Sequence, residues 1–445
     1  MRRDKGIPMY IDYSKSYRRD RRSSNIFIRI ILVFLIAGGL GLFSYYAIKL
    51  QIATQETGPS MEKEMDPGIL SGSEGGLAGV EQAQGSAKPD TDPNSVTEPG
   101  KAPEEKDTRI PTKGKGLYVT AGAAGTESIR SRLIEIADTT EINALVIDVK
   151  DDNGKITYAM DSPIAKKVGA VTNSVSDMEE LVQELQAKGI YVIARIVAFK
   201  DPYLAEQRHD LAIKKKDGSL YRDNNGECWV NPYHKEVWDY LVEVSSKAAA
   251  SGFNEIQFDY IRFSTGKGMD QVDFGKDAGT KSKEEVILEF TKYAYERLKP
   301  LGVFVSADVY GTIISSKIDA GLVGQNYVEM AKYLDYICPM IYPSHFGEGN
   351  YGVKYPDLEP LTIVRKVLTA SKEKLHEIPE GEHRAVVRPW LQDFTASWLQ
   401  NYMKYGGDEV RLQIEGVYAA GYEEWLLWNA ACNYSVEGLL KDPVN

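Results

Sequence analysis

The segment HKEVWDYLVEVSSKAAASGFNEIQFDYIRF (234–263) contains the pattern that decides the fold. Its first part repeats apolar residues at helical spacing and ends at Gly252, the kind of residue that terminates many helices just before a strand. Its second part, EIQFDYIRF (255–263), is a short apolar run rich in aromatic residues, which is typical of a buried strand. A helix followed by such a strand is the unit of a parallel sheet.

The same unit recurs from Gly114 onward, and two further helical segments end in Gly189 and Gly302. Eight repeats predict a closed (β/α)8 TIM barrel. The alternative is an open doubly wound sheet, but no G-x-G-x-x-G follows the first run. The eight predicted strands are GLYVT (116–120), ALVIDVK (144–150), IYVIARIVAF (190–199), EIQFDYIRF (255–263), VFVSADVYG (303–311), YICPMIYP (336–343), AVVRPWLQDF (385–394) and EWLLWNA (424–430).

The composition is that of a globular protein with an acidic body. The chain has 445 residues, 43% of them hydrophobic, and a net charge of −11. An acidic body argues against nucleic-acid binding, which favours a basic surface. The three cysteines and five histidines lack the short spacings of metal sites. We therefore predict no metal, no cofactor and no required protein partner.

The N-terminal region differs from the rest. Residues 1–25 are basic, and residues 26–49 form an apolar stretch whose uncharged part, 30–48, would span roughly 28 Å as a helix. We predict that this stretch is a transmembrane signal anchor. The chain would then be a single-pass membrane protein with its N-terminal tail in the cytoplasm and its barrel extracytoplasmic. A cleaved signal peptide is the alternative, although its apolar stretch is normally shorter. Residues 50–113, rich in Gly, Ser, Pro and acids, predict a disordered linker before a barrel at 114–445.

In a TIM barrel the functional groups lie at the carboxyl ends of the strands. Polar and aromatic side chains gather there in this chain, whereas a barrel interior is normally apolar. Carboxylates and amides bind sugar hydroxyls, aromatic faces stack on sugar rings, and two carboxyl groups carry out glycoside hydrolysis. The candidate catalytic residues are Asp259 and Asp308. The candidate substrate-binding residues are Asp148, Arg262, Tyr342, His345, Trp390, Gln392, Asp393 and Trp428.

Each candidate also has a structural interpretation. Asp259 could form a buried ion pair with Arg195 or Arg262, and Asp308 could cap the turn that follows it. The tryptophans could belong to the core. Glu255 and Gln257 lie deeper in the fourth strand and have a supporting role in this interpretation. The long segment 200–231 is expected to build one side of the cleft, with Tyr221 and Trp229 as candidate contacts. The cluster Asp151-Asp152-Asn153 lacks the remaining spacing of a calcium loop.

Several motifs occur together in order: LVIDVKDDNG, FDYIRF, SADVYG, CPMIYPSHF, RPWLQDF and WLLWNA. From about Lys115 to Tyr434 the chain resembles a bacterial family catalogued as putative glycoside hydrolases, barrels distantly related to the α-amylase type. The resemblance implies a nucleophile at Asp259, at the end of the fourth strand, and a further acid at Asp393, at the position that follows the seventh. The fifth strand offers Asp308 where α-amylase-type barrels have Glu, so the acid/base assignment departs from the pattern.

The sequence therefore predicts a membrane-anchored, extracytoplasmic glycoside hydrolase that acts on a polysaccharide or cell-envelope glycan. Asp259 would be nucleophile or base, and Asp308 the general acid. The alternative is a non-catalytic glycan-binding module on a degenerate barrel. Metal-dependent deacetylation would need clusters of His and Asp ligands that the sequence lacks.

Overall fold

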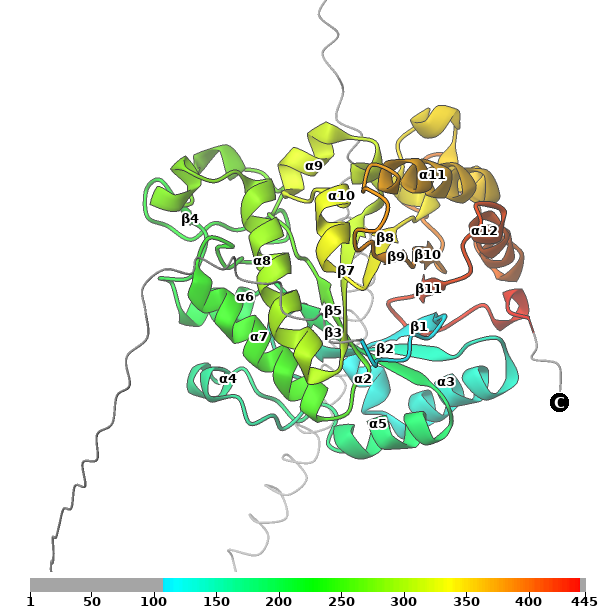
Figure 1. Ribbon diagram of the computed structural model, residues 1–445, viewed down its shortest axis with the longest axis horizontal. Coiled ribbons are helices and arrows are strands. Elements are labelled where there is room, and N and C mark those ends of the chain that lie inside the picture. The colour runs from blue at the N-terminus through cyan, green and yellow to red at the C-terminus, as the bar shows by residue number, and fades with distance from the viewer. Residues whose placement is uncertain (1–106, 441–445) are drawn as a thin grey trace, which may run out of the picture. The chain divides into compact units, whose positions relative to one another are not determined.

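A computed structural model describes residues 107–440, and they form a closed parallel barrel (Figure 1). The sheet runs in the order β10-β11-β1-β2-β3-β5-β7-β8-β9, and an additional pairing of β10 with β8 closes it. The predicted (β/α)8 barrel is confirmed, and the open sheet is excluded. The barrel strands are β1 (Lys115–Val119), β2 (Ala144–Lys150), β3 (Tyr191–Val197), β5 (Glu255–Asp259), β7 (Phe304–Tyr310), β8 (Tyr336–Met340), β9 (Val386–Val387), β10 (Trp390–Gln392) and β11 (Trp425–Trp428).

Helices connect the strands and surround the barrel (Figure 1). Helices end a few residues before Gly189, Gly252 and Gly302, as the sequence predicts, because their apolar stripe and their caps are both local features of the sequence. Ser282, for example, forms a capping box with Glu285 at the start of α8. The helices are α2 (Ala121–Ala124), α3 (Glu127–Thr139), α4 (Pro163–Val168), α5 (Met178–Ala187), α6 (Pro202–Gln207), α7 (Lys235–Ala250), α8 (Lys283–Leu298), α9 (Lys317–Val323), α10 (Tyr327–Met330), α11 (Pro360–Leu375) and α12 (Gly407–Ala419).

Two predicted strands differ from the observed ones: one ends earlier than predicted, and the other is divided in two. The run at 255–263 stops being a strand after Asp259, because Tyr260 adopts a left-handed backbone with φ of 50°. Such a conformation costs a non-glycine residue about 1–3 kcal/mol and turns the chain away from the sheet. The run at 385–394 is divided into β9 and β10 around Arg388 and Pro389, where proline has no N–H for the ladder.

Alternate residues of each strand divide the protein into two cores. Side chains pointing outward pack under the helices in one large hydrophobic cluster. Side chains pointing inward form a smaller cluster, which includes Tyr118, Val146, Ile193, Tyr336 and Trp390. The barrel interior is thus filled by side chains, as in other TIM barrels. The charged groups of the interior gather at the two ends of the barrel, and Gln257, whose amide lies 3.4 Å from the Cys338 sulfur, is buried between them.

The lower polar group is built around Arg388, whose side chain is fully buried. Its guanidinium pairs with Glu255 at 2.9 Å and with Glu424 at 2.8 Å, and it lies 3.6 Å from the centre of the Tyr336 ring. Glu255 also accepts a hydrogen bond from Tyr191. These contacts join β5, β9, β11 and β3 at the end of the barrel opposite the strand carboxyl ends. Glu255 therefore has the supporting position that the sequence predicted.

The chain in front of β1 is also attached to this end of the barrel. Arg109 pairs with Asp335 at 2.7 Å and lies 4.4 Å from the centre of the Phe304 ring. The predicted linker at 50–113 thus overlaps the folded part by several residues. The predicted tail (1–25), anchor (26–49) and most of the linker lie outside the described residues. Within 107–440, no helix combines the length and the hydropathy that a membrane span needs.

We predict that Arg388→Met destabilises the barrel by about 3–5 kcal/mol, because it leaves Glu255 and Glu424 buried without their cation. Urea unfolding of the full chain, followed by circular dichroism, measures the change in the free energy of unfolding. The control is Lys113→Met, which removes an exposed ion pair with Glu423 and should cost under about 1 kcal/mol. Equal effects of the two substitutions would contradict the prediction.

Candidate active site

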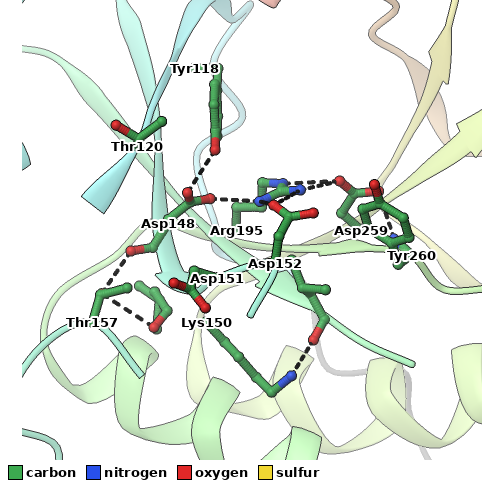
Figure 2. A network of polar contacts seen from close by, with 12 residues as sticks. Tyr118, Thr120, Asp148, Lys150, Asp151, Asp152, Thr157, Arg195, Asp259 and Tyr260 are labelled. Carbon is green, nitrogen blue, oxygen red and sulfur yellow. Dashed lines mark hydrogen bonds and ion pairs between the residues drawn. The ribbon is translucent and has the colours of Figure 1, made fainter. Parts of the chain in front are cut away.

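The upper polar group lies at the carboxyl ends of β2, β3 and β5 and is centred on Arg195 (Figure 2). The guanidinium of Arg195 donates to Asp148 at 2.7 Å, and to one oxygen of Asp259 from Nε at 3.0 Å and from Nη2 at 2.5 Å. The second oxygen of Asp148 accepts a hydrogen bond from Tyr118 at 2.7 Å. The strand register places these residues together, because β2 pairs Asp148 with Arg195 and β3 pairs Val197 with Asp259.

A third carboxylate completes the group around Arg195. Asp152, in the turn after β2, accepts two hydrogen bonds from Arg195 at 3.2 Å and pairs with Lys200 at 3.3 Å. Burial disfavours its charge, but the cations Arg195 and Lys200 outweigh this effect and hold the pKa of Asp152 well below its usual range. Asp148 differs, since burial raises its pKa to about 6 even though Arg195 opposes the shift.

Asp308 lies on the neighbouring strand, β7. The register pairs Phe258 with Ala307, so Asp259 and Asp308 are the next residues on the two strands. One oxygen of Asp308 accepts a hydrogen bond from the indole N–H of Trp390 at 2.6 Å. Burial, and after it the negative charge of Asp259, raise the pKa of Asp308 well above its usual range. The site therefore contains an ion-paired carboxylate beside a carboxyl group that favours its protonated form.

A pocket opens over these groups and encloses about 640 Å³, counting the space that is open to solvent. Charged groups form one part of its wall and aromatic rings the other. Such a mixed wall suits a ligand with both hydroxyl groups and apolar faces. The lining residues are Asp152, Arg195, Asp259, Tyr260, Arg262, Asp308, Tyr310, Met340, Tyr342, His345, Trp390, Phe394 and Trp428.

The aromatic wall is held in place by ring contacts. Trp428 stacks on Tyr118 with centroids 4.0 Å apart and meets Trp390 edge to face at 5.7 Å. The guanidinium of Arg195 lies 5.4 Å from both Tyr118 and Trp428. Because Tyr118 also donates to Asp148, the same residue aligns the charged group and the ring wall.

Three aromatic rings surround the guanidinium of Arg262. Its guanidinium lies about 5 Å from the rings of Trp229, Tyr260 and Tyr310, and it donates to the carbonyl of Phe263. Trp229, a candidate contact residue, thus supports Arg262 and does not line the pocket itself. Tyr221, the other candidate of that segment, is buried and bonded to Ser264.

The structure brings seven of the ten predicted site residues to the pocket wall: Asp259, Asp308, Arg262, Tyr342, His345, Trp390 and Trp428. Asp148 is not in the wall and pairs with Arg195 at 2.7 Å. Gln392 and Asp393 are not brought to the wall. Asp393 binds the backbone N–H and the hydroxyl of Ser435, and Gln392 binds Ser344 and Asp357. The carboxamide of Gln392 and the carboxylate of Asp393 thus hold neighbouring loops in place.

The predicted site left out six residues of the wall: Asp152, Arg195, Tyr260, Tyr310, Met340 and Phe394. Arg195 was considered as an ion-pair partner of Asp259, and alternation along the third strand could have identified it as an inward-facing residue. No sequence signal identifies the turn residue Asp152, because the turn brings it back over the barrel. Among the described residues, no group of three or more His, Cys, Asp or Glu is placed to hold a metal ion.

We predict that Arg195→Met lowers stability more at pH 8 than at pH 5. Burial already raises the pKa of Asp148 to about 6, above the unfolded value of about 4, and without the opposing charge of Arg195 this pKa rises further. The folded state then binds more protons than the unfolded state, so the free energy of unfolding falls as the pH rises. Thermal unfolding of both proteins at the two pH values measures the difference.

The control for this experiment is Arg208→Met, since Arg208 pairs with Asp210 and Glu236 at the surface. Its small effect should be similar at both pH values. A loss in Arg195→Met that does not depend on pH would contradict a shared counterion and indicate packing alone.

Comparison with known proteins identifies a family over most of the folded part. The family described as "Putative glycosyl hydrolase domain" matches residues 116–434, from β1 to the segment after β11. No curated protein matches the chain.

Solved structures resemble the barrel at different levels of identity. A hypothetical protein from Ruminiclostridium thermocellum is 39% identical, with a TM-score of 0.41, over 43% of this chain and 97% of its own. The PgaB (BpsB) glycoside hydrolase domain from Bordetella bronchiseptica is 12% identical, with a TM-score of 0.50, over 72% of this chain and 95% of its own. At this identity the likeness supports the fold alone.

Proposed function

Because the chain belongs to the family described as a putative glycosyl hydrolase domain, we propose that it hydrolyses a polysaccharide or cell-envelope glycan. The chemistry is acid–base catalysis by two carboxyl groups, Asp259 and Asp308. The observation that carries this proposal is their placement on adjacent strands of one pocket in opposite environments. Asp259 is paired with a cation, whereas burial and a neighbouring charge favour the proton on Asp308.

Asp308 would be the general acid. Glycoside hydrolysis needs one protonated carboxyl to donate to the leaving oxygen. Burial and the negative charge of Asp259 raise the pKa of Asp308 and so favour its protonated form. The indole N–H of Trp390 engages one oxygen of Asp308. A proton on the other oxygen could then be aimed at the substrate. Since Asp is shorter than the Glu of α-amylase-type barrels, the glycosidic oxygen must bind close to β7.

Asp259 would be the nucleophile, or the base that activates water. Arg195 holds one of its oxygens with two hydrogen bonds, and the backbone N–H of Tyr260 donates to the other at 2.6 Å. These contacts keep the carboxylate oriented next to Asp308. Arg262, Tyr342 and His345 would bind the sugar's polar groups, while Trp390 and Trp428 would stack on its ring.

The proposed location is the outer face of a membrane. A basic tail at 1–25 precedes an uncharged apolar stretch at 30–48, and this order supports an anchor with the tail in the cytoplasm. The described domain begins at the barrel end opposite the pocket, where Arg109 binds Asp335.

We predict that Asp259→Asn and Asp308→Asn each lower kcat by about 10²–10⁴-fold, the contribution typical of acid–base groups. The assay is reducing-end release by the full chain in mild detergent, on a panel of α- and β-glucans and cell-wall glycans. Asp161→Asn, an exposed carboxylate paired with Lys166, is the control and should retain activity. Full activity of Asp259→Asn would refute its catalytic role.

The pH profile tests the assignment of the acid. Only protonated Asp308 can donate, so kcat/KM falls as the pH rises through its pKa. Since that pKa is raised, we expect the alkaline limb well above pH 4, the usual value of a free Asp side chain being about 3.9. Asp308→Asn should lose this limb together with most of the activity. A variant that keeps the limb would move the acid to another residue.

The anchor is tested by fractionation. We expect the full chain to stay with membranes after washing with high salt, and a chain that starts at residue 50 to be released. Protease added to wall-stripped cells should cleave the full chain within 50–106 and free the barrel. Protection of this segment would contradict an extracytoplasmic location.

A glycan-binding module is the alternative, and one observation favours it. Both oxygens of Asp259 already accept hydrogen bonds from Arg195 and Tyr260, as in a purely structural ion pair. In that case no glycan of the panel is cleaved, and glycan binding survives Asp259→Asn and Asp308→Asn. Turnover that both substitutions abolish would exclude the alternative.

A further inference from the structure

A row of aromatic rings leads from the pocket onto the loop between β10 and α12, residues 393–406. Tyr342 lines the pocket and meets Phe394 edge to face, with ring centroids 5.8 Å apart. Phe394 lies beside Trp398, with centroids 6.0 Å apart and an angle of 23° between the rings. Phe394 and Trp398 are each only half-buried. A large ring that a loop holds partly exposed next to a pocket is a common feature of binding surfaces.

The loop that carries these rings is held by buried polar groups. Gln392 donates to the carbonyl of Phe394 at 3.0 Å and to Asp357 at 3.1 Å. The same Asp357 accepts a hydrogen bond from the backbone N–H of Met403. The backbone N–H of Tyr405 donates to the hydroxyl of Thr395. Both ends of the loop are thus fixed, and the rings are positioned before any ligand binds.

His345 packs against both Phe394 and Trp398 and carries no charge. Its ring meets Phe394 at 6.1 Å and Trp398 at 6.3 Å, both nearly perpendicular. Its Nδ1 is 2.8 Å from the hydroxyl of Ser344, which also binds Gln392. Burial lowers the pKa of His345 to about 3, so the imidazole is neutral at physiological pH. The imidazole that packs against Phe394 and Trp398 therefore brings no charge to them.

We propose that Trp398, together with the pocket-lining Phe394, forms an additional sugar-stacking subsite at the edge of the pocket, and that the substrate is a glycan chain long enough to reach it. This inference rests on the proposed function and specifies its substrate class. Each sugar ring has an apolar face that stacks on an aromatic ring. A second sugar that leaves the pocket past Tyr342 meets Phe394 and then Trp398. Gln392 is then a positioning residue that acts through the loop.

The test compares long and short substrates. Trp398→Ala should lower kcat/KM on hexasaccharides of α-1,4-glucan, β-1,3-glucan, β-1,4-glucan or chitin by about three- to tenfold, the size of one aromatic stacking contact. It should leave kcat/KM on the p-nitrophenyl monosaccharide of the same sugar unchanged. Trp398→Phe keeps an aromatic face and should restore most of the loss. All variants are assayed as the full chain in mild detergent.

Tyr333→Ala is the matched control, because Tyr333 is a partly exposed ring just before β8, at the opposite end of the barrel. It should not change the ratio between long and short substrates. An equal loss on both substrates in Trp398→Ala would indicate a structural role for Trp398 and overturn the proposal. An unchanged hexasaccharide rate would also overturn it.

The outcome separates this proposal from the proposed function. If the wild-type chain cleaves nothing, affinity electrophoresis in gels that contain the same glucans or glycol chitin measures binding alone. Weaker retardation of Trp398→Ala, with Trp398→Phe and Tyr333→Ala unaffected, would support the subsite although hydrolysis fails. Equal retardation of all variants, or no retardation of the wild type, would overturn the subsite.

Discussion

The buried guanidinium of Arg195 is the interaction on which the rest of the site depends. A buried charge is costly unless it is paired and hydrogen-bonded. Arg195 meets this condition with Asp148, Asp152 and Asp259. These three carboxylates come from β2, from the turn after it and from β5. One cation thus joins three parts of the rim and keeps three negative charges within a small volume.

The barrel repeats this arrangement at its other end. There Arg388 pairs with Glu255 and Glu424, and the inner cluster of side chains lies between it and Arg195. The two groups have different surroundings. The group at Arg388 is enclosed and contacts the segment before β1 through Thr112, whereas the group at Arg195 lines an open pocket. The group at Arg388 therefore lies inside the barrel, whereas the group at Arg195 faces the pocket.

Asymmetry within the upper group gives the two candidate catalytic carboxyls different properties. Asp259 shares the cation, whereas Asp308 has an indole N–H as its partner and receives the repulsion of Asp259. A difference of this kind is what acid–base chemistry with two carboxyls needs. The aromatic wall depends on the same network, because Tyr118 binds Asp148 and stacks on Trp428. Charge and shape in the pocket are thus fixed by shared residues.

The sequence by itself determined the barrel, its helices and most of the pocket wall. Helix and strand periods are local, and a parallel barrel brings every strand's carboxyl end to one rim, so Asp259, Asp308, Trp390 and Trp428 could be placed there. Only the tertiary structure decided which partners these groups have. Arg195 could have paired with Asp259 alone, and Gln392 and Asp393 follow the same strand-end pattern as the wall residues. Closure of the barrel and the paths of its loops turned Gln392 toward Asp357 and brought Asp152 over Arg195, because such contacts depend on residues distant in sequence.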